Sequence, residues 1–408
     1  MMNESVRQPS PLQRLASIDV FRGMVMFLML AEMLRLGRFA DMQFTSSWGK
    51  WMTEHQVWDW LKFHTTHVEW SGGSLHDMIQ PGFSFLVGVS LPFSLAARQA
   101  RGQSPWSMLL HAAWRAMALV LLGIFLRSLG RSATYFTLED TLSQIGLGYF
   151  FLVVLGMMPS QANWIALGTL LVGFWIAFFL FPLPGADFSY PAVGVPEDWQ
   201  HHRPGIAAHW NKNSNLSWWF DRWLLNLFPR EKRFEFHPGG YATLSFVPTL
   251  ATMILGAIAG GWLKGIPEWK GRSAKLLLLG GASIGLGWLL DLTGLCPIVK
   301  RIWTPSWTLW SGGICVLWLL ALHWICDVAQ WRWWAFPFSV IGANSILAYV
   351  IDWTILGWIR DNWTRHLQWL PQRWTTPLLT DFGLSCLTFA TVWLVLLYLY
   401  RKKIFIRL

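Results

Sequence analysis

Five side chains that can carry charge or move protons stand close together just before and at the start of an apolar run: His64, His67, Glu69, His76 and Asp77. Histidine titrates near neutral pH and can act as a general base toward an amine or a hydroxyl group. A neighbouring carboxylate can fix the histidine's tautomer, and two consecutive glycines between these residues allow the loop to turn back onto the following helix. The group therefore predicts an acid–base site in an interfacial loop.

Two other interpretations of this group remain open. The order His64, two residues, His67, one residue, Glu69 supplies metal ligands of an ordinary kind. No established ligand spacing is present, so no metal is predicted. The plainest alternative is a loop of solvated histidines without a chemical role.

Ionisable residues also occur inside the first apolar run. Asp19 and Arg22 lie three residues apart, on one face of a helix, and Glu32 follows ten residues after Arg22. A carboxylate at bilayer depth costs several kcal/mol unless it is paired or hydrated. Asp19 with Arg22 is either a structural ion pair or part of a site, whereas Glu32, which has no partner nearby in the sequence, predicts a polar interior cavity.

Polar residues recur in later apolar runs. Gln144 lies in LSQIGLGY, and Asn344 with Ser345 lies in GANSILAY. The small residues beside them permit close helix approach. Singly, each could join two helices by a hydrogen bond, but together they indicate a wet or ligand-filled interior.

The elements that position these residues are membrane helices. Hydrophobic residues make up 54% of the 408 and charged residues 13%, about half the charged share of a soluble protein. Apolar runs near the ~18 residues that a bilayer requires recur along the chain. We predict an all-α integral membrane protein, a polytopic bundle of about 10 transmembrane helices (10–11), forming a single domain over residues 1–408. The expected spans are Ile18–Leu36, Leu75–Ala97, Met108–Arg127, Thr141–Met158, Trp164–Phe181, Phe246–Leu263, Leu276–Leu290, Trp307–Ile325, Phe336–Ile355 and Leu384–Tyr400, with a further or re-entrant segment conceivable in Asn362–Leu379.

The charges predict the orientation. The net charge is +10, and the basic residues cluster in short stretches between apolar runs. This distribution is typical of the cytoplasmic loops of membrane proteins, which are enriched in Lys and Arg. A nucleic-acid partner is therefore not expected. Both termini are predicted in the cytoplasm, in a bacterial inner membrane, and no cleavable signal is expected. The two long external loops are about residues 37–74 and 182–245.

Lys300 and Arg301 are basic residues on the predicted external side, contrary to the charge rule, which indicates a local counter-charge or ligand. The four cysteines suggest no disulfide framework.

In their order, these motifs resemble the transmembrane acyltransferases typified by heparan-α-glucosaminide N-acetyltransferase, and their bacterial relatives of unknown function. The resemblance runs from SIDVFRG through HVEWSGG and IQPGFSFLVGVS to LSQIGLGY, TLSFVPTLATMILGAIAG, KRIWTPSWTLWSGG and GANSILAY, and so covers nearly the whole chain.

The resemblance implies a function and site residues. Family enzymes move an acetyl group from cytosolic acetyl-CoA to an amino sugar across the membrane. The family's loop histidine falls on His67, with Trp70 as a landmark, and its acidic residue falls on Asp77. Acetyl-CoA (acyl-CoA) is thus the expected donor, with Arg22, Gln144, Asn344 and Ser345 along its path and Arg98, Arg101, Lys264 and Lys275 near its phosphates. Asp19, Glu32, Lys300 and Trp303 are the expected substrate-side or supporting residues.

The acceptor is left open, because the chain departs from the family pattern at Glu32, at Ile145 and at His237–Gly240. A saccharide or glycolipid with a sugar amine or hydroxyl is expected, with His67 acting as base or as transient acyl carrier. A catalytically silent membrane subunit and a transporter or flippase are the alternatives, and a homodimer is also left open.

Overall fold

The structure is a computed structural model that describes residues 15–34, 36, 54–367 and 377–406. Within them, helices are the only regular elements apart from one isolated bridge between Ser71 and Val299. The predicted all-α polytopic membrane fold is confirmed. The helices are α1 (Ala16–Ala31), α3 (Glu54–Thr65), α4 (Ile79–Ala100), α5 (Pro105–Ser128), α6 (Thr141–Gly156), α7 (Ser160–Leu180), α8 (Leu216–Leu224), α9 (Phe246–Gly265), α10 (Trp269–Leu292), α11 (Pro305–Leu322), α12 (Phe336–Ala343), α13 (Ser345–Thr354), α14 (Leu356–Leu367) and α15 (Pro377–Arg401).

All ten apolar runs are helical in the part of the chain described, but they differ in length. Seven helices are long and apolar enough to span a bilayer. α12 and α13 make an eighth span if they are counted together, and they meet at a 65° bend. α6 has 16 residues, about 24 Å of helix against a hydrocarbon core of about 30 Å, whereas α1 continues directly into the 3₁₀ helix Glu32–Leu34. The chain is therefore a multi-pass integral membrane protein.

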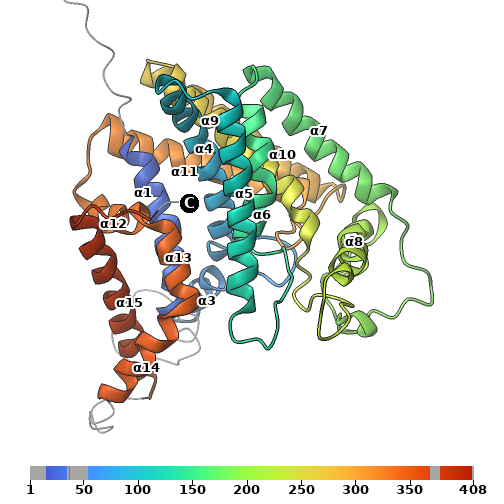
Figure 1. Cartoon of the computed structure of the whole chain (residues 1–408). Coiled ribbons are helices and arrows are strands. Elements are labelled where there is room, and N and C mark those ends of the chain that lie inside the picture. Colours follow the sequence, from blue (N-terminus) through green and yellow to red (C-terminus); the bar gives the residue numbers. More distant parts are fainter. Residues whose placement is uncertain (1–14, 35, 37–53, 368–376, 407–408) are drawn as a thin grey trace, which may run out of the picture.

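The helices form two groups (Figure 1). α4 packs on α9, α5 on α6 and α10 on α11, whereas α1 packs on α12 and, with α13–α15, forms the second group. One apolar core joins α4, α9 and α11, and a separate one joins α1 to α12–α15. The cavities described below lie between these two groups.

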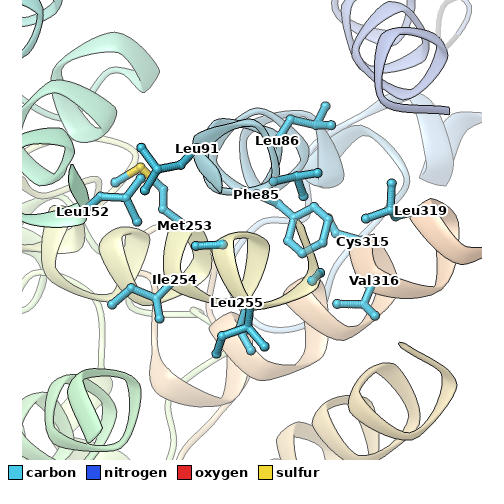
Figure 2. Packing of buried hydrophobic residues seen from close by; sticks show 14 of the residues in the cluster. Phe85, Leu86, Leu91, Leu152, Met253, Ile254, Leu255, Cys315, Val316 and Leu319 are labelled. Carbon is cyan, nitrogen blue, oxygen red and sulfur yellow. The ribbon is translucent and has the colours of Figure 1, made fainter. Parts of the chain in front are cut away.

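Close contact between α4 and α9 depends on glycine. A Cβ atom on Gly88 would overlap the Met253 carbonyl, and one on Gly256 would overlap the Phe85 carbonyl. Small residues let two membrane helices approach until their backbones touch. Figure 2 shows the side chains around this crossing, where Phe85, Met253 and Leu255 fill the space beside it.

The first long loop, about residues 37–74 and predicted to be external, is only partly described, because residues 37–53 lie outside the described residues. Its second half contains α3. The other long loop, about residues 182–245, contains α8 and short 3₁₀ turns around a buried aromatic cluster with Trp70, Trp199 and Trp210. The aromatic side chains thus order this loop over the outer end of the bundle.

Candidate functional site: a histidine, a carboxylate and a lysine at a cavity

His67, Asp77 and Lys300 meet at one point. His67 Nδ1 lies 2.8 Å from Asp77 Oδ1, and Lys300 Nζ donates to the same oxygen at 2.9 Å. Lys300 Nζ also lies 3.1 Å from His67 Nδ1. An ionised carboxylate only accepts hydrogen bonds, so His67 Nδ1 is the donor of this contact, which leaves Nε2 as the nitrogen that can accept a proton. This is the geometry of a base held by a carboxylate.

Asp77 is held from its other side by the loop. Its Oδ2 accepts from the backbone N–H groups of Val68 and Ser74, both at 3.1 Å. The Ser74 hydroxyl lies 3.0 Å from the same oxygen. Asp77 is 1% exposed, and these donors supply the hydrogen bonds that a buried carboxylate needs. The orientation of His67 is therefore fixed by a carboxylate that cannot rotate freely.

Lys300 reaches this point because two loops pair. Ser71 forms a β-bridge with Val299, and the Gly72 N–H donates to the Ile298 carbonyl at 2.8 Å. Arg301 then donates to the carbonyls of Val68, at 3.2 Å, and of Gly239, at 2.7 Å. The counter-charge expected for Lys300 is Asp77.

A second histidine completes the group. The rings of His67 and His76 lie 4.4 Å apart between centroids. His76 Nε2 lies 3.7 Å from Glu32 Oε2, so the acid of the first span faces the loop histidines. His64 accepts from the Leu75 N–H at 3.1 Å, which holds the base of the loop.

Two adjoining cavities lie near this histidine pair, and both histidines line the outer one. The outer cavity, about 250 Å³, is lined by His67, His76, Lys300 and Glu32, and also by Met29, Ile79, Gln80, Phe83, Arg127, Glu139, Asp140, Thr141, His237, Tyr241, Tyr349 and Trp353. The inner cavity, about 600 Å³, lies among α1, α4, α5, α6, α12 and α13. Phe83, Thr141 and Tyr349 line both, so the two cavities share a wall or a passage.

The inner cavity is basic. Its charged lining residues are Arg22, Arg98, Arg101 and Arg115, with His111 beside them, and none of the described residues that line it is a carboxylate. Arg22 donates to Ser90 at 3.0 Å and pairs with Asp19 at 3.3 Å. Arg115 donates to the Tyr149 hydroxyl at 3.1 Å. Arginines around a cavity of this size suit an anion such as a phosphate.

The outer cavity has a different electrostatic character. Burial, together with Arg127 and Arg301 nearby, lowers the pKa of His237 to about 4, and the Gly239 N–H donates to its Nδ1 at 3.0 Å. A neutral imidazole is needed to accept that bond. Burial raises the pKa of Glu139, whose Oε1 lies 3.8 Å from His237 Nε2. The outer cavity thus pairs neutral polar groups with His67 and Lys300.

Several expected site residues lie elsewhere. Gln144 is buried and its amide nitrogen donates to the carbonyls of Leu138, Ala242 and Thr243, so it joins α6 to the loop before α9. It does not line the inner cavity, whereas Ser345 does. Asn344 hydrogen-bonds the chain after α15.

The expected tryptophans pack rather than face a ligand. Trp70 is 1% exposed, and its ring occupies the space that a side chain at Gly240 would need. Trp303 is also 1% exposed and donates to Thr252 at 3.1 Å. Neither lines the two cavities. Lys264 and Lys275 do not line the inner cavity either.

The metal alternative gains no support from these positions. Glu69 pairs with His201 at 3.4 Å, and His64 is bonded to the loop backbone. Among the described residues, no three His, Cys, Asp or Glu side chains are grouped as ligands.

Sequence reasoning missed several lining residues. His111 and Arg115 lie one helical turn apart inside an apolar span. Residues four apart lie on the same face of a helix, and a charged side chain inside an apolar span is costly unless it faces a polar interior. These two facts could have placed His111 and Arg115 on the side of α5 that lines the cavity. Arg127, Glu139, His237 and Tyr241 lie near helix ends or in loops, where polar residues carry no such signal.

Comparison with known proteins gives one consistent match. The chain is 24% identical to the heparan-alpha-glucosaminide N-acetyltransferase of Homo sapiens over 96% of this chain and 59% of that protein. It is 24% identical to the enzyme of the same name from Mus musculus, over 97% and 61%. The chain is thus similar to these two acetyltransferases over almost its whole length.

The resemblance found in the motifs is thereby confirmed along almost the whole chain. No protein-family model matches the chain. The chain spans about 60% of the length of these acetyltransferase relatives.

Proposed function

We propose that this protein is a membrane-embedded acyltransferase that moves an acyl group, acetyl above all, from acyl-CoA in the inner cavity to an acceptor in the outer one. The observation that carries the proposal is that His67 lines the outer cavity, which shares the lining residues Phe83, Thr141 and Tyr349 with the basic inner cavity. The similarity to two N-acetyltransferases over almost the whole chain supports the same reaction class.

The donor's charge fits the basic inner cavity. The phosphates of acyl-CoA would lie against Arg98, Arg101 and Arg115, and no carboxylate opposes them among the lining residues that the structure describes. The pantetheine arm would then extend past Arg22 toward Phe83 and Tyr349, where the cavities adjoin. Arg98 lies in the last turn of α4 and Arg101 directly follows it, and the basic character of this end of the helix predicts the cytoplasmic side, so the donor would enter from the cytoplasm.

The reaction needs one base and no redox partner. The acceptor's N–H or O–H bond breaks as its nitrogen or oxygen forms a bond to the acyl carbon. The C–S bond breaks, and the departing thiolate ends as the thiol of CoA with the proton that His67 Nε2 has carried. Alternatively Nε2 attacks the thioester first and holds the acyl group until the acceptor takes it. In either route the contact of Asp77 with Nδ1 orients the ring.

The acceptor we propose is a saccharide or glycolipid with a free amine or hydroxyl group. The outer cavity, about 250 Å³, suits a single sugar ring, and Tyr241 and Trp353 offer aromatic walls beside polar groups. This external position, and cytoplasmic termini in a bacterial inner membrane, belong to the same proposal.

The experiment is transfer of labelled acetyl from acetyl-CoA by purified protein in liposomes, with a panel of sugar amines and alcohols outside. Wild type should transfer label, and His67→Ala should lose transfer while still binding CoA. A His67→Ala variant that transfers at the wild-type rate would exclude this chemistry.

The two alternatives make different predictions. CoA binding would be retained by a silent subunit, but no acceptor would be labelled. A transporter of unrelated solutes would not be stabilised thermally by CoA. Transporters typically contain interrupted helices in corresponding halves, and among the described residues a single bent pair, α12 with α13, is present.

A further inference from the structure

The chain reverses direction directly after α15. Lys403 has a positive φ of 57°, the Lys403 N–H donates to the Tyr400 carbonyl at 3.1 Å, and the Ile404 N–H donates to the Leu399 carbonyl at 2.9 Å. This is the bond pattern that ends a helix with a residue in the left-handed region. The turn sends Ile404, Phe405 and Ile406 back toward the bundle.

Asn344 holds this returning segment with both ends of its side-chain amide. Its Nδ2 donates to the Ile404 carbonyl at 3.0 Å, and its Oδ1 accepts from the Ile406 N–H at 2.9 Å. Asn344 is fully buried and lies in the break between α12 and α13, where the helices bend by 65°. A buried amide with both functions satisfied fixes its partner in one register.

The segment held in this way forms part of the inner cavity. Ile406 lines that cavity together with Gly342, Ala343, Ser345 and Ile346, which flank Asn344 in the sequence. Ile406 is 47% exposed, so it lies at an edge of the cavity rather than in its depth. The cavity keeps about 600 Å³ with the segment in place, so the segment bounds it and does not fill it.

We propose that Ile404–Ile406 is a strap that completes the wall of the donor cavity and that Asn344 is the positioning residue that fastens it. This inference rests on the proposed function, because it assumes that the cavity binds acyl-CoA. The strap presents an aliphatic side chain to the cavity, opposite a basic lining, and so suits the apolar parts of the donor while the arginines hold its phosphates. Asn344 acts through the strap and touches no reacting atom.

The test is the equilibrium Kd for CoA, measured on detergent-purified full-length variants. Asn344→Leu keeps the side-chain size and removes both hydrogen bonds of the amide to the strap. It should raise the Kd for CoA about tenfold, because the strap would no longer be held against the cavity. Ile406→Ala should raise it about threefold, because it trims only the wall. At saturating acetyl-CoA the transfer rate of both variants should stay within about twofold of wild type, since neither residue lies at His67.

Two matched controls separate the strap from general damage. Asn362→Leu makes the same replacement on α14, where the amide donates to the Trp358 carbonyl within its own helix, and should leave the Kd unchanged. Lys403→Gly suits the positive φ and keeps the turn, so it should also leave the Kd unchanged.

A folded Asn344→Leu protein with wild-type thermal midpoint and a Kd within twofold of wild type would overturn the inference. If Asn344→Leu does not fold, Ile406→Cys decides: CoA should slow its reaction with a maleimide, and no protection would overturn the strap. If wild-type protein binds no CoA, the proposed function fails and the strap fails with it. If wild type binds CoA and the variants bind equally well, only the strap fails.

Discussion

Asp77 and Lys300, 223 residues apart in the chain, form an ion pair of 2.9 Å in which the side chains are 1% and 5% exposed. Two charges taken out of water are stable only when they meet each other with further hydrogen bonds. Asp77 has those bonds from Val68 and Ser74, and the pair ties the histidine loop to the loop before α11. The site and the packing of the external loops therefore depend on the same contact.

Removing one partner of this pair should destabilise the protein strongly. We expect Lys300→Met to lower the free energy of unfolding by about 3–5 kcal/mol, because Asp77 is then left buried without its counter-charge. Asp77→Asn with Lys300→Met should recover part of that loss, since no buried charge remains. Thermal unfolding in detergent of the four proteins of the cycle measures it, and strictly additive losses would show that the two residues do not interact.

Glycine at the crossing of α4 and α9 should tolerate no side chain. Gly256→Ala places a methyl group on the Phe85 carbonyl, so we expect a loss of about 1–3 kcal/mol. Gly261→Ala, on the same helix with open space around it, should be neutral or stabilise by about 0.5–1 kcal/mol. Equal thermal midpoints for the two variants would contradict the close approach.

Much of the fold could be predicted from the sequence. Each apolar run became a helix because length and composition in a bilayer permit little else. His67 and Asp77 could also be placed together, since they lie ten residues apart with two glycines between them. Lys300 was expected outside with an unnamed counter-charge, and the structure identifies Asp77 as that partner.

What the sequence could not supply is the choice among equivalent hydrogen-bond partners. Gln144 and Asn344 are polar residues in apolar helices, and each was expected on the donor's path. In the structure the Asn344 amide bonds the backbone of Ile404 and Ile406, and the Gln144 amide nitrogen donates to backbone carbonyls of other segments, while Gln144 Oε1 has no partner among the described residues. A buried amide group usually has a hydrogen-bond partner. The spacing of polar residues along the sequence does not show whether that partner is a ligand or the backbone of a loop.

The arginines of the inner cavity should control donor affinity. We expect Arg115→Ala to raise the Kd for CoA about tenfold, because one charge-assisted contact to a phosphate is lost. Binding by wild type should weaken as salt is raised, and the variant should show a shallower salt dependence. Arg233→Ala, an exposed arginine in the second external loop and not among the lining residues, is the matched control. Unchanged CoA binding by Arg115→Ala would place the phosphates elsewhere.

Two buried groups outside the spans should give opposite pH dependences of stability. The pKa of His237 is lowered to about 4, so the unfolded chain binds its proton more readily between pH 4 and 6.5, and stability should rise with pH across that window. Burial raises the pKa of Asp221 to about 7, so the folded protein holds the proton more tightly between pH 4 and 7, and stability should fall with rising pH.

Single substitutions separate the two effects. Relative to wild type, His237→Gln should gain stability toward pH 4, and Asp221→Asn should gain it toward pH 7, each by on the order of 1–3 kcal/mol. Denaturation midpoints at several pH values provide the measurement. A difference from wild type that does not change with pH would show that the group in question titrates normally.

The central claim is that an acyl-CoA thioester reaches His67 through the inner cavity. The most direct measurement is an electron cryomicroscopy map of the His67→Ala protein with acetyl-CoA bound, compared with wild type and CoA. We expect phosphate density against Arg98, Arg101 and Arg115, and a pantetheine thread ending with its thioester within about 4 Å of the position of the His67 ring. Density for acetyl-CoA outside the inner cavity, or with its thioester remote from residue 67, would contradict the account.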